Sequence, residues 1–144
     1  MQTTQQRPVG VVATRPRVAA DGAVALTAAA AAALVWACAR ISDLHLVVRS
    51  GSGTTDVSAP SVIVTTLVVA AAGAGLLRLL ERRTAKALRV WTIVAVTVWG
   101  LSFLGPLSAT RPSTGLVLAG VHLLVGAVVV VGLRRTHAQI TPVA

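Results

Sequence analysis

Four apolar stretches, separated by short polar links, dominate the pattern of this 144-residue chain. They cover residues 18–40, 60–80, 89–107 and 114–133. An α-helix rises about 1.5 Å per residue, so stretches near 20 residues match the roughly 30 Å hydrocarbon core of a bilayer. The pattern therefore predicts an all-α, up-and-down bundle of four transmembrane helices, formed by residues 18–135.

The link between the first two stretches predicts a short β-hairpin. Residues 44–48 and 54–57 are β-prone, and the Gly/Ser-rich residues 49–53 between them suit a turn. Such a hairpin would cap one end of the bundle. Asp43 and His45 could ligate a metal, but two candidate ligands do not make a site, and we expect a solvated loop.

Basic residues are distributed unevenly between the two ends of the predicted bundle. Ten of the 13 Lys and Arg residues precede the first stretch, lie around the link 81–89 or follow the fourth stretch. The other three are Arg40, Arg49 and Arg111. The positive-inside rule therefore places both termini in the cytoplasm of a bacterium, with the helices in its inner membrane.

The segments outside the four stretches are polar. Residues 1–17 predict a disordered, basic cytoplasmic arm, and residues 136–144 a cytoplasmic tail in which His137 is solvated. An alternative for the first stretch is a cleaved signal or lipoprotein segment ending near Ala37-Cys38-Ala39. Its apolar run exceeds the usual 7–15 residues of such segments, which favours a retained first span.

Composition excludes several classes of function. Hydrophobic residues make up 55% of the chain and charged residues 12%, about half the charge of a soluble domain. The net charge of +9 lies at span ends rather than on one face, so no nucleic-acid partner is expected. A single Cys38, four acidic residues and no nucleotide, hydrolase or zinc-protease motif predict neither cofactor nor metal, and no catalytic residue.

One polar layer is expected within the bundle. His122 is the only ionisable residue well inside a predicted span, about 10 Å from the end that carries the hairpin. Helix rise places the other members at depths of about 6–8 Å; they are Trp36, Thr65, Thr66 and Ser102. This layer is either a ligand, ion or proton site or interhelical hydrogen bonding that holds the helices together.

Small residues predict close helix contacts. Six consecutive alanines, Ala28–Ala33, place the first span in the bundle interior. Gly73 marks the second span, and the fourth carries a stripe spaced by four, three and four residues; it consists of Gly115, Ala119, His122 and Gly126.

Charged and aromatic residues near the span ends have simple expected roles. Asp21 suits a cap at the start of the first helix, and Arg78 would extend its guanidinium to the membrane surface. Trp91 would anchor the third span at the interface. The basic link should attract anionic lipids at the cytoplasmic face; its residues are Arg82, Arg83, Lys86 and Arg89.

Several short segments resemble a family of short actinobacterial membrane proteins of unknown function. The resemblance covers residues 18–135 and implies a four-helix integral membrane domain without a known activity. The segments that carry it are Asp43-Leu44-His45-Leu46-Val47-Val48, Pro60, Leu80-Glu81-Arg82-Arg83, and Gly115, His122-Leu123, Gly126 and Arg134-Arg135 in the last span.

Two functions remain open from the sequence. The first is a non-catalytic interaction or accessory module in a membrane assembly, which contacts itself or another membrane protein through its Ala/Gly faces. The alternative is a small transporter or ligand-binding membrane protein that uses the polar layer around His122.

Overall fold

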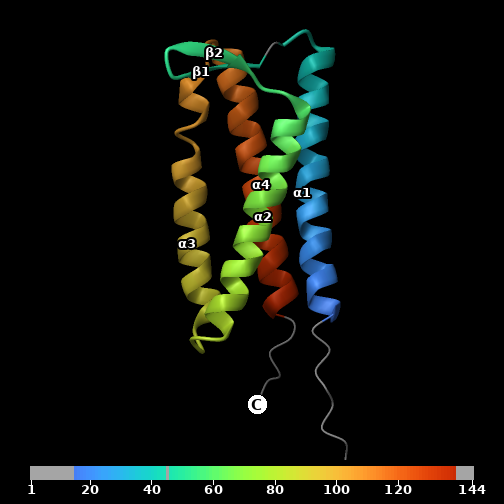
Figure 1. The fold of residues 1–144 in the computed structure, drawn as a ribbon, viewed down its shortest axis with the longest axis vertical. Coiled ribbons are helices and arrows are strands. Elements are labelled where there is room, and N and C mark those ends of the chain that lie inside the picture. The colour runs from blue at the N-terminus through green and yellow to red at the C-terminus, as the bar shows by residue number, and fades with distance from the viewer. Residues whose placement is uncertain (1–14, 45, 139–144) are drawn as a thin grey trace, which may run out of the picture.

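Four helices run side by side in the computed structural model, which describes residues 15–44 and 46–138 (Figure 1). They are α1 (Arg15–Ile41), α2 (Ala59–Glu81), α3 (Ala87–Ser102) and α4 (Pro112–Ala138). Each is long and apolar enough to cross a membrane, the third when its extension to Ser108 is included. The predicted four-helix bundle is confirmed. The start of α1 and the end of α4 lie together at what we call the termini end.

The helix bounds refine the predicted segments. α1 begins at Arg15, inside the predicted arm, and α4 continues to Ala138, inside the predicted tail. The rest of the arm and tail, residues 1–14 and 139–144, lies outside the described residues, as does His45. Ser58 caps α2 by accepting a hydrogen bond from the backbone N–H of Ser61 at 3.4 Å, with Pro60 in the first turn.

A β-hairpin closes the opposite end of the bundle, which we call the hairpin end (Figure 1). Strands β1 (Val47–Ser50) and β2 (Gly53–Asp56) pair antiparallel, which confirms the predicted hairpin. Gly51 has a φ of 59°, a conformation that a two-residue hairpin turn requires and that glycine adopts without strain. The backbone N–H of Thr110 donates to the carbonyl of Val47 at 3.2 Å and so fastens the hairpin to the link before α4.

The core lies where α1 packs against α2 and α4. Ala28 and Ala32 of α1 are fully buried, and Ala70 and Ala74 of α2 are nearly so. Alanine lets helix backbones approach closely, so the alanine-rich α1 lies tightly against its two neighbours.

The third helix is attached differently, through tryptophans. Trp91 donates from its indole N–H to the carbonyl of Gly73 in α2, and Trp99 donates to the carbonyl of His122 in α4, both at 2.8 Å. Trp91 is 1% exposed, so the prediction that it anchors the helix at an interface is wrong. A buried indole needs a partner for its N–H, and carbonyls of the two neighbouring helices supply one each.

The regular part of α3 is shorter than predicted. It ends at Ser102, whereas the sequence pattern predicted a span to residue 107. Pro106 has no N–H to donate to the carbonyl of Ser102 and restricts the residue before it. The chain instead continues through a turn, in which the backbone N–H of Gly105 donates to the carbonyl of Ser102 at 3.1 Å, into the 3₁₀ helix η1 (Pro106–Ser108).

Two glycines of α4 make room for neighbouring side chains. A Cβ atom at Gly126 would overlap the indole of Trp99, and one at Gly132 would lie 2.8 Å from a methyl group of Val24 in α1. Gly120 of the same helix is exposed and has no atom within 4 Å of such a Cβ.

Replacing Gly126 with alanine should therefore destabilise the bundle by about 1–3 kcal/mol, because the indole of Trp99 must move and lose its hydrogen bond. Gly120→Ala is the matched control and should be neutral or stabilising by up to about 1 kcal/mol, since alanine favours the helix. Thermal unfolding in lipid nanodiscs, followed by circular dichroism, measures both. Equal stability of the two variants would contradict the observed packing of Trp99 on Gly126.

Candidate ligand-binding cleft

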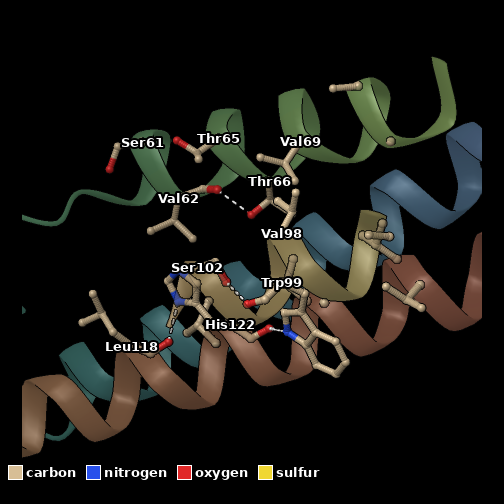
Figure 2. A pocket seen from close by; sticks show the side chains of 18 of the residues that line it. Ser61, Val62, Thr65, Thr66, Val69, Val98, Trp99, Ser102, Leu118 and His122 are labelled. Atoms are coloured by element: carbon tan, nitrogen blue, oxygen red, sulfur yellow. Dashed lines mark hydrogen bonds between the residues drawn. The ribbon is translucent and has the colours of Figure 1, made fainter. Parts of the chain in front are cut away.

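A cleft of about 590 Å³ lies between α2, α3 and α4 and extends from the hairpin end to Trp91, near the start of α3 (Figure 2). Alanine contacts hold α2 and α4 against α1, while the side chains of Trp91 and Trp99 connect α3 to α2 and α4. Leu46 and Val57, which flank the two strands, line its upper part. Trp91 and Val130 line its deep end, and both are buried.

All five residues of the predicted polar layer line this one cleft. Trp36 comes from α1, Thr65 and Thr66 from α2, Ser102 from α3 and His122 from α4. The structure thus brings together side chains from all four helices. The rest of the lining is almost entirely valine, leucine, alanine and tryptophan, so these few polar groups lie in apolar surroundings.

Hydrogen bonds fix the orientation of the polar groups. Nδ1 of His122 lies 2.8 Å from the carbonyl oxygen of Leu118, which can only accept, so Nδ1 carries the proton in the neutral ring. Ser102 and Thr66 each donate their hydroxyl to a carbonyl of their own helix, of Trp99 at 2.6 Å and of Val62 at 2.7 Å (Figure 2). Their oxygens keep lone pairs that can accept a hydrogen bond.

The second ring nitrogen of His122 is available. Nε2 makes no hydrogen bond to any residue that the structure describes, and the atom is accessible at the protein surface. The ring packs against Phe103, with centroids 6.2 Å apart. In the neutral ring with the proton on Nδ1, Nε2 is a hydrogen-bond acceptor at the cleft.

The cleft opens sideways between helices. The lining residues that are exposed at the protein surface all belong to α2 and α3; they are Ser61, Thr65, Val69, Ala72, Leu76, Val94 and Val98. In a bundle that spans a bilayer, such an opening faces lipid rather than water. An apolar molecule dissolved in the membrane could therefore enter without crossing an aqueous phase.

Trp36 joins the cleft to the hairpin. Its indole N–H donates to the carbonyl of Val57 at 2.8 Å, and the guanidinium of Arg40 lies 5.7 Å from the ring centroid. Val57 in turn donates its N–H to Leu46 at 2.8 Å. The residues that close the cleft at the hairpin end are thereby tied to α1.

The predicted helix-packing residues face other parts of the same chain. A Cβ at Gly73 would lie 3.8 Å from Leu133, and one at Gly115 would lie 3.3 Å from the carbonyl of Pro106. Gly126 packs on Trp99, as described above, and Ala119 is half-buried. Bulky side chains at these glycines would meet other parts of the same chain, so their effect cannot by itself report on assembly.

The basic link lies at the termini end, and all four of its predicted lipid contacts are exposed. Lys86 and Arg89 border a shallow depression together with Arg134 from the end of α4. None of these three cations forms a salt bridge within the part of the chain that the structure describes.

A buried charged cluster, which the sequence did not predict, joins three helices at the same end. Asp21 of α1 accepts from Arg78 of α2 at 2.5 Å and lies 3.1 Å from Nε2 of His137 in α4. Nδ1 of His137 lies 2.7 Å from Glu81 of α2, and Arg17 is 4.0 Å from the same carboxylate. Asp21 is 6% exposed and His137 is 7% exposed.

This cluster corrects two predictions, for Asp21 and His137, and gives Arg78, which is 36% exposed, a carboxylate partner. Asp21 is not a helix cap, because α1 begins six residues earlier and has no acidic residue in its first turn. Arg78 pairs with that carboxylate, and His137 is buried rather than solvated. One feature of the sequence could have indicated the cluster: Asp21, Arg78 and His137 all lie at the ends of predicted spans on the predicted cytoplasmic side. Among residues 15–44 and 46–138, no group of three His, Cys, Asp or Glu suits a metal ion.

Comparison with known proteins gives a family without an assigned activity. Residues 12–139 match the sequence profile of a family of unknown function, DUF6069. No curated protein and no solved structure matches the chain.

Proposed function

We propose that this chain, which belongs to the DUF6069 family, is a membrane protein that binds an apolar ligand bearing a hydroxyl group. The observation that carries the proposal is the cleft of about 590 Å³, in which Nε2 of His122 has no partner among the described residues. Of the two functions that the sequence left open, the proposal therefore follows the second, a ligand-binding membrane protein.

Size and lining support an apolar small molecule. Ligand pockets in proteins commonly measure about 300–1,000 Å³ and are mostly apolar, with a few polar groups that fix orientation. The cleft fits this description, and its side opening between Val69 and Val98 suits a ligand that partitions into lipid.

The polar groups support a ligand that donates a hydrogen bond. Nε2 of His122 accepts when the ring is neutral, and Ser102 and Thr66 have already used their protons on helix carbonyls. A hydroxyl group would donate to Nε2, whereas an ether or a hydrocarbon would leave that nitrogen without a partner.

The placement in the membrane is part of the proposal. The helices lie in a bacterial inner membrane, with the termini end in the cytoplasm and the hairpin outside, because the basic residues gather at the termini end. Lys86, Arg89 and Arg134 contact anionic lipid headgroups there. The other function drawn from the sequence, a module in a larger membrane assembly, stays a prediction. The exposed helix faces are compatible with it.

Filling the cleft should block binding. The probe is a long-chain alcohol brominated along its chain, because all three tryptophans of the protein line the cleft and bromine quenches indole fluorescence on contact. Ala72 lines the cleft, and its neighbour Ala71 does not. Ala72→Phe should weaken saturable quenching in nanodiscs about tenfold or more, a loss of ~1.4 kcal/mol. Ala71→Phe is the matched control and should quench like the original protein.

The role of His122 is tested by a pair of probes. The protein should prefer the brominated alcohol over its methyl ether by roughly 2–13-fold, the value of one hydrogen bond of about 0.5–1.5 kcal/mol. His122→Phe keeps a ring beside Phe103 and should bind both probes equally. An unchanged preference in this variant would exclude His122 as the acceptor, and unsaturable quenching in the original protein would refute the cleft as a binding site.

Orientation is tested by labelling introduced cysteines. In a Cys38→Ala background, Ser52→Cys at the hairpin turn should react with a membrane-impermeant maleimide in intact cells. Arg83→Cys in the link between α2 and α3 should react only after the membrane is permeabilised. The reverse pattern would invert the proposed topology.

A further inference from the structure

In the buried cluster at the termini end, one hydrogen-bond acceptor lacks a donor when His137 is neutral and both carboxylates are ionised. Both ring nitrogens of His137 face carboxylate oxygens, of Asp21 at 3.1 Å and of Glu81 at 2.7 Å. A neutral imidazole has one N–H and one lone pair, and an ionised carboxylate can only accept. With neutral histidine and two carboxylates, one of the two contacts would set lone pair against lone pair.

One additional proton removes this conflict. It can reside on the imidazole, which then donates from both nitrogens, or on one carboxyl group, which then donates to the ring. In either form each nitrogen–oxygen contact contains one hydrogen. The 2.7 Å separation from Glu81 agrees with a charge-assisted hydrogen bond.

The net charge of the cluster also indicates one additional proton. α1 contributes Asp21, with Arg17 at the edge, and α2 contributes Glu81 and Arg78. From α4 only His137 enters the cluster; its neighbours Arg134 and Arg135 are exposed. Two carboxylates and Arg78 leave one unit of negative charge, which the additional proton neutralises. Arg17 is half-exposed and 4.0 Å from Glu81, so it compensates more weakly.

We propose that Asp21, Glu81 and His137 form a buried proton-binding site, whose proton joins α1, α2 and α4 at the termini end. The His137 side chain is 3% exposed and that of Asp21 is 5% exposed, so this part of the site is nearly closed, while Glu81 is 31% exposed and forms its outer side. Losing it turns one hydrogen bond into a repulsive contact and loosens α4 from α1 or from α2. This inference does not rest on the ligand proposed for the cleft.

Nitrogen NMR of the protein in nanodiscs tests the site directly. With histidines labelled with ¹⁵N, the signals of His137 at neutral pH should show either two protonated ring nitrogens or a ring hydrogen-bonded to a protonated carboxyl. The chain has three histidines, so His45→Gln together with His122→Gln leaves the signals of His137 alone. A free neutral ring, with one nitrogen protonated and the other without a hydrogen bond, would overturn the proposal.

Stability against pH gives a second readout. A histidine in an unfolded chain is largely neutral above about pH 7. If the folded protein binds the additional proton, stability is lost as the pH rises. The unfolding temperature of the original protein should therefore fall as the pH is raised through the range in which the additional proton is lost. His137→Gln cannot bind the proton and should lose this dependence.

Arg135→Gln is the matched control for the second readout. It removes a cation from an exposed position two residues before His137, outside the cluster. It should keep the pH dependence of the original protein. The same pH dependence in His137→Gln and in the original protein would refute the site; if His137→Gln does not fold, the NMR result decides.

Discussion

The separation between helices, set by the size of the side chains at each contact, determines the rest of this structure. Alanines bring α1 close to α2 and α4, so Ala28 and Ala32 are fully buried. α3 meets its neighbours through the indoles of Trp91 and Trp99, which are far larger. α1 therefore packs closely on both of its neighbours, whereas α3 meets the same two helices through bulky side chains, so the interior is not filled evenly. The cleft is the space that these unequal contacts leave between α3 and its two neighbours.

The two ends of the bundle hold different chemistry. Toward the hairpin, neutral polar groups accept hydrogen bonds around an apolar cleft. At the termini end, ionised groups pair with one another and leave little room. Buried Leu77, Trp91 and Leu133 lie between these regions and separate them. Because apolar packing isolates the charged cluster from the cleft, each can be altered by mutation without direct contact with the other.

The sequence predicted the members of the cleft better than those of the charged cluster, for a physical reason. Depth in a span follows from helix rise alone, so His122 and Ser102 could be placed in one layer before their rotation was known. The cluster depends on where helices end and which faces meet. Asp21 and His137 are 116 residues apart, and no local pattern links them. Trp91 was misassigned because interfacial and buried tryptophans occupy similar positions near a span end.

The attachment of α3 has a consequence for how the molecule moves. This helix buries only Ala87 and Trp91, and two indole hydrogen bonds tie it to its neighbours. Segments with few buried contacts open at a lower free energy than the whole protein unfolds. We therefore expect α3 to fluctuate as a unit against the other three helices. The volume of the cleft is then not fixed but an average over these excursions, so the proposed site would accommodate ligands of different width at little energetic cost.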